Sequence, residues 1–570
     1  MDKSFEVVVA IDFGTSRSGF AYKFKESDDS VFRDLWPDSP INFPKTATHL
    51  LVSPTGEIEA WGYTAMKKLA ELRAKKTAKD YYFARNFKME LHSGKKDRIG
   101  PYLINKSNGE KIYVIDLIAE YIRLIKDEAL KEIKNSTSGE LKDKEIRWCL
   151  TIPAIWKDED KDLMRRAAQK AGLIGSSDDE AERLFLVLEP EAAAIFCQEE
   201  DKNALTPGTK IMIVDCGGGT VDITVHKVLI DGGLNEVAPG TGGHFGSMYV
   251  DKSFQEYLTE KLCDEMVEGF HNQEPVGYLE MMYQWEGIKC NFNPETSDDV
   301  INFVIPAGFY KFISKRKPEL LEKLADEQNG DDENIHLSCE RMENIFRPTL
   351  DGLVSTVKNQ FTKLEDEQVD IIFLVGGFST SPVLRQRIKK EFGNRVEKIV
   401  TPPRPGAAIL EGAASFGVSP AIIRARRSRL TYGSSCSRPF NESIDPESKK
   451  FWAKDLGRYQ CNSRFSTIVT VGDSVPVNQE IVHSYTSLTA EGKSMYLEFY
   501  ATSKKEVRYT DEKGVEKIGE ITVQMPSTKG GVDRRVDLFC YFGDTEIKIN
   551  AVDRTSGSRC KTSLRFLSRY

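Results

Sequence analysis

The sequence lacks several features that would assign it to a membrane, secreted or zinc-binding class. No apolar run approaches the ~20 residues that a helix needs to span a bilayer, and IIFLVGGF at 371–378 is among the longest. The N-terminal stretch, MDKSFEVVVAIDFG, has no basic start, long apolar core or cleavage site, so secretion is not expected. The 10 cysteines form no C-x-x-C pair, which favours reduced thiols in the cytosol. We expect a cytoplasmic protein without a membrane span.

The sequence has no excess of basic residues. Lys and Arg number 79 against 87 Asp and Glu, which gives a formal net charge of −8. A nucleic-acid binder needs a clustered basic surface to neutralise phosphates, and the one basic cluster is IIRARRSRL at 422–430. We therefore expect no nucleic-acid partner. The 570 residues are enough for two or more domains, because one domain usually takes ~100 to 200.

Two glycine-rich segments resemble each other. VVVAIDFGTSRSGFAYKF at 7–24 and IMIVDCGGGTVDITVHKV at 211–228 are each typical of a strand, a tight turn and a second strand. Asp12 and Asp215 occupy corresponding positions at the ends of the first strands. The repeat suggests a duplicated domain whose halves face one cleft. For the second copy alone, a tight hairpin turn that tolerates three glycines is the simpler alternative.

The chain between and after these segments alternates strands with amphipathic helices, such as the one expected at 113–133. This alternation predicts an α/β fold with mixed sheets covered by helices. EPEAAAIF at 189–196 and RPGAAILEGAASFG at 404–417 resemble each other and are rich in alanine and glycine. Small side chains would let two helices cross closely, as a hinge requires. The alternative is simply an alanine-rich helix.

The pattern changes from about residue 466. Short β-rich segments such as SMYLEFYATS and GEITVQMP are separated by turn residues, which predicts an antiparallel sandwich. In TEIKINAV, Ile547, Ile549 and Ala551 fall on one face. The preceding stretch, roughly 419–465, carries the arginine cluster and is typical of a linker with an insertion.

The acids beside the glycines suggest phosphate chemistry. Glycine has no Cβ, so its amide can approach an anion closely, and the turn forms a concave set of N–H donors. Asp12 and Asp215 would repel a phosphate, but both fit a hydrated Mg²⁺ that lies between them. The site is neither a P-loop nor a dinucleotide fingerprint, because G-x-x-x-x-G-K-[ST] is absent and the glycines lead into a strand.

These motifs resemble the superfamily of actin, sugar kinases and seventy-kilodalton heat-shock chaperones. IDFGTSRSG is similar to its first phosphate motif, IVDCGGGTVDI to its second, and LVGGFSTSP at 374–382 to its adenosine motif. The two alanine-rich segments resemble its connecting helices.

Other segments resemble particular branches of this superfamily. TIPAIWKDEDKDLMRRAAQKAGL at 151–173 and FGSMYVDKSF at 245–254 are similar to the chaperones. WEGIKCNF and FARNFKMELH resemble the divergent heat shock 70 kDa protein 12A/12B-like branch.

The resemblance implies a two-lobed actin-like ATPase domain, ribonuclease-H-like and duplicated, followed by an antiparallel β-sandwich. The nucleotide-binding domain would cover 1–418, with lobe I at about 1–205 and lobe II at about 206–400 plus a return helix. Residues 419–465 would form a linker or insertion. Residues 466–570 would form a sandwich that resembles a chaperone's substrate-binding domain, without a helical lid.

The resemblance also implies a set of site residues. The phosphates would be bound by Gly14, Thr15, Ser16, Gly217, Gly218, Gly219 and Thr220. Mg²⁺ would be held through water by Asp12 and Asp215. Adenosine would be bound by Glu286, Lys289, Gly376 and Gly377. Catalytic roles would fall to Lys88, Glu189, Asp215, Thr220 and Asp222.

The implied catalytic roles have alternatives. Lys88 would offset charge on the γ-phosphate and position the attacking water, but Arg85 in the same segment competes for this role. Glu189 would order metal-bound water and Asp222 would lie one step further out. Each could instead be an ordinary helix-entry or strand acid.

The sequence departs from the chaperone pattern in places. Cys290 and Thr380 stand where the chaperones place an arginine on each side of adenine, which puts base affinity in doubt. Arg404 lies where an acid is usual before the second connecting helix. The short acidic linker is replaced by SPAIIRARRSRL, so the chaperones' allosteric coupling is not assumed.

We predict an ATP-binding, slowly ATP-hydrolysing chaperone-like protein of the stress response. ATP or ADP with Mg²⁺ would set lobe closure, and the sandwich would bind a polypeptide client or a protein partner. A nucleotide-exchange factor is a further expected partner. Two alternatives are a nucleotide-sensing adaptor or scaffold with little turnover, and a small-molecule kinase of the same superfamily.

Overall fold

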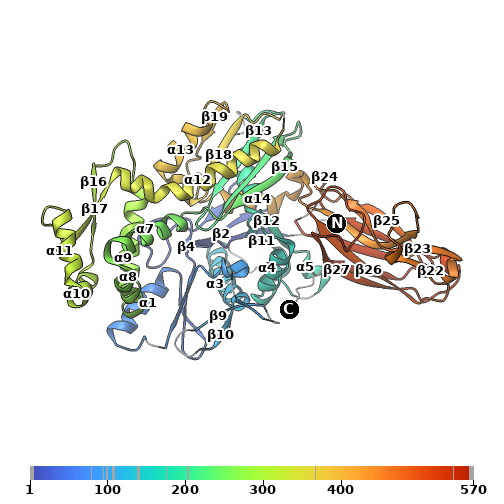
Figure 1. Ribbon diagram of the computed structural model, residues 1–570, viewed down its shortest axis with the longest axis horizontal. Helices are drawn as coiled ribbons and strands as arrows, with labels where there is room; N and C mark the ends of the chain where they lie inside the picture. The colour runs from blue at the N-terminus through green and yellow to red at the C-terminus, as the bar shows by residue number, and fades with distance from the viewer. Residues whose placement is uncertain are drawn as a thin grey trace. The chain divides into compact units, whose positions relative to one another are not determined.

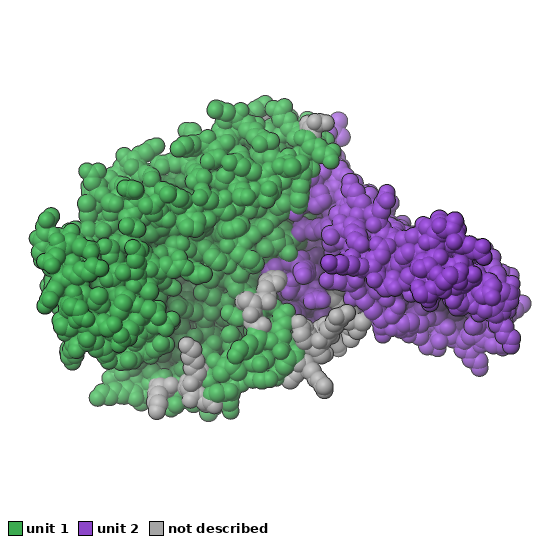
Figure 2. Space-filling model, in the orientation of Figure 1, with its two compact units in different colours: residues 1–155, 167–225, 241–419 green, residues 156–166, 226–240, 420–570 purple. Residues whose placement is uncertain are grey.

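A computed structural model describes most of the chain as two compact units, which Figure 2 colours separately. The described residues are 5–78, 80–93, 95–97, 100–105, 109–137, 141–175, 177–201, 205–365, 367–543 and 545–563. Unit 1 comprises Met1–Ile155, Ala167–Val225 and Thr241–Ser419. Unit 2 comprises Trp156–Arg166, His226–Gly240 and Pro420–Tyr570.

A first mixed sheet in unit 1 has the strand order β12-β11-β1-β2-β3, and β4 also pairs with β2. β1 runs parallel to β11 and antiparallel to β2. All six residues of β1 are buried, because α3 and α14 both pack on β1 and β2 (Figure 1). The strands are β1 (Val7–Asp12), β2 (Arg17–Phe24), β3 (Val31–Phe32), β4 (Thr46–Ala47), β11 (Ile146–Ile152) and β12 (Leu184–Leu188).

A second set of strands repeats this order as β19-β18-β13-β14. β13 runs parallel to β18, which runs parallel to β19, just as β1 runs parallel to β11 and β11 to β12. The repeat seen in the sequence is therefore matched by a repeat in strand order, and the predicted mixed α/β content is confirmed. The strands are β13 (Lys210–Cys216), β14 (Val221–Val228), β18 (Ile371–Val375) and β19 (Lys398–Val400).

Small antiparallel sheets complete unit 1. Their strands are β5 (His49–Val52), β6 (Ile58–Trp61), β7 (Tyr82–Arg85), β8 (Lys95–Lys96), β9 (Pro101–Ile104), β10 (Lys111–Tyr113), β16 (Val300–Val304) and β17 (Asn334–Ser338). The α-helices of the described chain are α1 (Gly62–Ala74), α2 (Glu90–Ser93), α3 (Val114–Ser136), α4 (Asp158–Lys170), α5 (Asp178–Ala181), α6 (Glu189–Glu200), α7 (Met248–Leu262), α8 (Asp264–Gln273), α9 (Pro275–Asn291), α10 (Ala307–Arg316), α11 (Pro318–Glu327), α12 (Cys339–Lys363), α13 (Pro382–Phe392) and α14 (Ala408–Val418). Within the described ranges, none of them combines the length and apolar character that a membrane crossing needs.

The helices α6 and α14 cross in backbone contact. A Cβ atom at Gly412 would overlap the carbonyl oxygen of Ala192, so glycine is required at this point of α14. Both helices are buried along most of their length. The close crossing expected from the two alanine-rich segments is confirmed.

Unit 2 contains two antiparallel sheets that share one core. Their strand orders are β22-β23-β21-β26-β27 and β25-β28-β29-β30, and the core joins Leu497 of β26 to Leu538 of β28. Ile547, Ile549 and Ala551 are all buried in this core, as their alternation predicted. The strands are β21 (Thr431–Pro439), β22 (Lys450–Ala453), β23 (Arg458–Val469), β25 (Ile481–Thr486), β26 (Ser494–Thr502), β27 (Val515–Gln524), β28 (Arg535–Tyr541), β29 (Lys548–Asp553) and β30 (Arg559–Ser563).

The stretch 419–465, for which the sequence predicted a linker with an insertion, is largely β-structure. It holds β20 (Ile423–Arg427), β21, β22 and the first part of β23. The arginine-rich β20 pairs antiparallel with β24 (Ser474–Pro476) and parallel with the start of β15 (Leu234–Gly243). These strands are rich in arginine, serine and other polar residues, which obscure the apolar alternation that would predict a strand.

The helix crossing generates a stability prediction. Gly412→Ala should lower the free energy of unfolding by roughly 1–3 kcal/mol, because the added methyl group overpacks the contact with α6. Gly287→Ala in α9 is the matched control. No heavy atom lies within 4 Å of a Cβ atom there, and alanine should favour the helix by up to about 1 kcal/mol. Urea unfolding of the two variants measures the difference, and equal stabilities would contradict the close crossing.

Candidate functional site

The two glycine-rich turns lie against each other within unit 1. A Cβ atom at Gly218 would overlap Ser16 Oγ, and one at Gly219 would lie 2.7 Å from Thr15 Oγ1. The turns therefore meet only because these two positions carry no side chain. The structure brings together the two segments from which the sequence predicted a phosphate site, and phosphate binding itself stays a prediction.

Hydrogen bonds close each turn, and one of those at the first turn comes from Thr48, which follows β4. The Gly14 amide donates to Ser18 Oγ at 3.1 Å, and the Gly14 carbonyl accepts from Thr48 Oγ1 at 2.9 Å. In the second turn, the Gly217 amide donates to the Thr220 carbonyl at 3.0 Å. These bonds hold the short connections between β1 and β2 and between β13 and β14 in one conformation.

Four carboxylates gather where these strands end. Asp12 ends β1, Asp215 lies near the end of β13, Asp222 lies at the start of β14, and Glu189 begins α6. All four are buried, with at most 6% of each residue exposed. The structure thus brings together four acids that come from separate segments of the sequence.

Two buried lysines pair with these acids. Lys88 Nζ donates to the Phe13 carbonyl at 2.6 Å and lies 3.0 Å from Glu189 Oε1. Lys45 Nζ lies 2.5 Å from Asp12 Oδ2. Arg85 was the alternative to Lys88 in the sequence. Its positive charge instead has a lowering influence on the pKa values of His49 and of two tyrosines. Lys88 is therefore the member of that segment that lies among the acids.

Lys45 was missed by sequence reasoning. It precedes the two-residue strand β4 in the segment NFPKTATHL, which belongs to no repeat and no quoted motif. Only the folded structure brings it to Asp12, whose other carboxylate oxygen accepts from Thr151 Oγ1 at 2.9 Å. No signal in the sequence distinguishes it from the many surface lysines.

Burial is the main influence on the titration of two of these acids. Burial raises the pKa of Glu189 to about 7, with further contributions from Asp12 and Asp222, although Lys88 opposes the shift. Burial also raises the pKa of Asp215 well above its ordinary value, reinforced by Glu189 and Asp222. Both acids therefore keep a proton to higher pH than an exposed carboxyl group does.

The donor set fits a hydrated cation. Among the described residues, the buried Oδ1 atom of Asp215 has no hydrogen-bond partner, and such an orphaned carboxylate oxygen is costly unless a cation or a water satisfies it. No three His, Cys, Asp or Glu side chains in the described part of the chain are placed to ligate one metal ion directly. Mg²⁺ commonly keeps several of its waters and uses one or two carboxylates, which matches this arrangement.

The predicted adenosine residues of α9 form a second charged cluster. Lys289 is buried and pairs with Asp251 at 2.7 Å and with Glu286 at 2.5 Å. Glu286 also pairs with Arg17 at 3.4 Å, and the exposed Cys290 donates its thiol to the same carboxylate oxygen at 3.6 Å. Burial would raise the pKa of Glu286, but Lys289 and Arg17 outweigh it, so the pKa is lowered.

The two glycines of the predicted adenosine motif lie at the end of β18. Val375 pairs with Asp215 of β13, and Gly376 follows it with a φ of +82°. A Cβ atom at Gly376 would overlap Asp215 Oδ1, so this glycine lies beside the acid cluster. Gly377 opens a short 3₁₀ helix that ends at Thr380, and nothing lies within 4 Å of a Cβ atom there.

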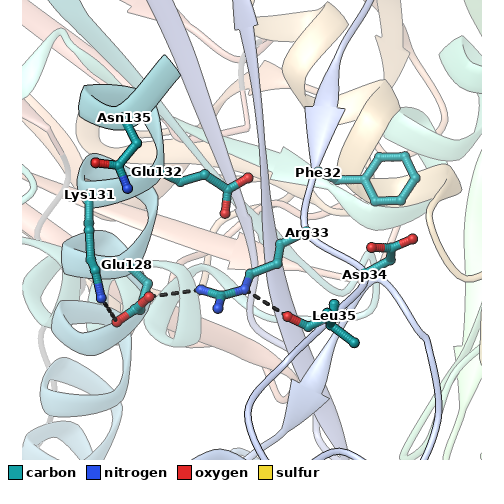
Figure 3. Close-up of a pocket in the computed structure, with 8 residues that line it drawn as sticks. All are labelled: Phe32, Arg33, Asp34, Leu35, Glu128, Lys131, Glu132 and Asn135. Carbon is teal, nitrogen blue, oxygen red and sulfur yellow. Dashed lines mark hydrogen bonds and ion pairs between the residues drawn. The ribbon is translucent and has the colours of Figure 1, made fainter. Parts of the chain in front are cut away.

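A pocket of about 320 Å³ lies elsewhere in unit 1. Figure 3 shows its lining, which includes Phe32 next to β2 and Glu132 on α3. Arg33 is held there by Glu128 at 2.8 Å and by the Leu35 carbonyl at 3.0 Å. None of the predicted site residues lines this pocket, so it is not part of the candidate site.

Comparisons with known proteins agree with the motifs. A family model described as Hsp70 protein matches residues 85–300 and 313–420. Heat shock 70 kDa protein 12A of Homo sapiens is 30% identical over 99% of this chain and 92% of its own length. Heat shock 70 kDa protein 12B of Homo sapiens is 29% identical over the same shares. Chaperone protein DnaK of Thermosipho melanesiensis is 25% identical over 73% of this chain and 59% of its own length.

The raised pKa of Glu189 generates a pH prediction. Between its ordinary value of 4.5 and its folded value of about 7, the folded state holds a proton that the unfolded state has lost. The free energy of unfolding should therefore fall as pH rises through this window, by on the order of 3 kcal/mol at ~1.4 kcal/mol per pKa unit.

Glu189→Gln should remove this part of the pH dependence. Thermal unfolding of the wild type and the variant from pH 5 to pH 8 measures it. Parallel pH profiles for the two proteins would show that Glu189 titrates normally.

Proposed function

The chain belongs to the Hsp70 family, and from that premise we propose that it is an ATP-binding, slowly ATP-hydrolysing chaperone-like protein. The buried acid cluster with Lys88 at its edge, where two repeated hairpins meet, is the observation that carries this proposal. ATP or ADP with Mg²⁺ binds there, and unit 2 binds a polypeptide client or a protein partner. A nucleotide-exchange factor and a cytoplasmic, stress-related setting belong to the same proposal.

The turns and the acids bind different parts of the ligand. The amides and hydroxyls of the two turns bind the phosphates, and these groups come from Gly14, Thr15, Ser16, Gly217, Gly218, Gly219 and Thr220. Asp12 and Asp215 hold Mg²⁺ through water. When bound, the ion offsets the charge of the β- and γ-phosphates. The orphaned oxygen of Asp215 supports this assignment.

Lys88 and Glu189 act on the hydrolysis step. Water attacks the γ-phosphorus in line, the bond to the ADP oxygen breaks, and a proton leaves the water. Lys88, fixed by the Phe13 carbonyl and Glu189, stabilises the charge on the transferred phosphoryl group. Glu189, whose pKa is about 7, is suited to orient the water and take up its proton near neutral pH. Asp222 accepts a hydrogen bond from the Ile155 amide and lies farther from the metal-bound water than Glu189 does in this proposal.

Nucleotide state sets the conformation in this proposal. The helices α6 and α14 meet in backbone contact at Gly412 and form the hinge between two lobes. The bound γ-phosphate favours the closed arrangement by its differential contacts. The same change alters the affinity of the sandwich for its client.

A nucleotide-sensing adaptor with little turnover is the second candidate. Its support comes from the nucleoside end of the site. Cys290 and Thr380 lie where the chaperone pattern has arginines, and Glu286 is already engaged by Arg17 and Lys289. In this candidate ATP sets the conformation, and the sandwich docks one folded partner.

Substitution of Lys88 tests the catalytic assignment. Lys88→Met should lower ATP turnover by about 100-fold or more, because one positioned charge in such a site is worth that much, and it should leave Mg-ATP bound. Steady-state phosphate release and equilibrium binding measure the two effects. Lys67→Met is the control, since Lys67 is exposed and forms an ion pair with Asp38. Turnover equal to that of the control would remove Lys88 from the mechanism.

Turnover in the presence of an unfolded polypeptide separates the two candidates. Reduced, carboxymethylated α-lactalbumin is a suitable probe because it stays unfolded without denaturant. A chaperone-like protein should hydrolyse ATP faster when the probe is added, whereas an adaptor should not respond. A rate that is unchanged across a saturating range of probe would favour the adaptor.

A further inference from the structure

Arg17 links the first glycine-rich turn to α9. It directly follows Ser16, and its Nη2 atom lies 3.4 Å from Glu286 Oε1. Its Nε atom donates to the hydroxyl of Tyr63 in α1 at 3.2 Å. The side chain therefore spans from the proposed phosphate end to the proposed nucleoside end of the site.

The plane of the Arg17 guanidinium is fixed on several sides. Tyr63 and Glu286 hold two of its nitrogens, and the ring of Phe43 lies 5.1 Å from its central carbon. Burial would lower the pKa of Arg17, but Tyr63 and Glu286 outweigh it, so the pKa is raised and the charge persists. About a quarter of the side chain, 27%, remains exposed. A flat, charged and preoriented group with an accessible part is suited to stack on another flat group.

Arg17 lies next to Cys290. The Cys290 thiol and the Arg17 guanidinium both donate to Glu286 Oε1, so the two side chains converge on one atom. The Cys290 thiol has neither a flat surface nor a charge on which a purine could stack. A base can stack on an aromatic ring or on the plane of a guanidinium, and the Arg17 guanidinium contacts Glu286 at this end of α9.

We propose that the Arg17 guanidinium is the flat cation on which the nucleobase stacks. It takes the place of the arginine that α9 lacks at Cys290, although Arg17 lies far from α9 in the sequence. This inference rests on the proposed function, because it needs ATP to bind between the two turns and α9. Arg17 is then a specificity-determining residue for the base, whereas the phosphates are bound by the turns. In a site with Cys290 and Thr380, Arg17 would then provide the flat cation on which a base can stack.

The test compares a ligand that has a base with one that has none. Dissociation constants for Mg-ATP and for magnesium-bound inorganic triphosphate are measured on the full chain by calorimetry. The variant is Arg17→Lys, which keeps the charge and can still pair with Glu286 but loses the plane. It should bind Mg-ATP about 10-fold more weakly and bind inorganic triphosphate as the wild type does. Adding Cys290→Arg to this variant should recover much of the lost ATP affinity.

Arg85→Lys is the matched control. Arg85 is another half-buried arginine, on β7, and its charge lowers the pKa of His49 as that of Arg17 does. Its substitution should leave both dissociation constants unchanged. Melting temperatures of the ligand-free proteins establish that each variant is folded.

Two outcomes would overturn the proposal. If Arg17→Lys weakens ATP and inorganic triphosphate equally, Arg17 acts on the phosphates and not on the base. If Arg17→Lys binds ATP as the wild type does, a plane at this position is not needed. Failure of the proposed function looks different, because the folded wild type would then bind neither ligand.

Discussion

Burial of several carboxylates in one place is the constraint on which the rest of the site depends. Asp12, Glu189, Asp215 and Asp222 lie together out of water, and burial, reinforced by the neighbouring acids, raises the pKa values of Glu189 and Asp215 although Lys88 and Lys45 oppose the shifts. Folding alone gains nothing from such an arrangement, since burying like charges is costly. A cation that binds only the folded state offsets the cost. In this view the site is built for a magnesium-bearing ligand, and part of the protein's stability depends on that ligand.

The repeated strand order explains how the acids come to meet. Each repeat places an aspartate at the end of a strand that is buried beside a parallel neighbour. The two turns touch because Gly218 and Gly219 leave room for Ser16 and Thr15. The helices α6 and α14 cross at Gly412, where backbone meets backbone, and α6 begins with Glu189. A few glycines thus determine how closely two copies of one motif approach, and that approach creates the charged cluster.

Local and repeated patterns were readable in the sequence, and long-range contacts were not. The Asp12 and Asp215 repeat, the alanine-rich helices and the buried face of β29 follow from spacing alone. The role of Lys45 and the pairing of Arg17 with Glu286 could not be predicted in this way. Arg17 and Glu286 are 269 positions apart, and neither Lys45 nor Arg17 belongs to a periodic pattern. The strands between 419 and 465 were missed for a different reason. Their arginine and serine content hides the alternation that identifies a strand, and β20 gains its partners from distant segments.

In the proposed function, the two hairpins together hold one magnesium-bearing triphosphate. Calorimetric titration of folded, nucleotide-stripped protein with ATP, with and without Mg²⁺, tests it most directly. The account predicts a saturable heat with Mg-ATP, a much weaker one when EDTA removes the metal, and loss of the metal dependence in Asp215→Asn. The same heat in EDTA would contradict the role of the acids, and no heat from folded protein under any condition would contradict the site itself.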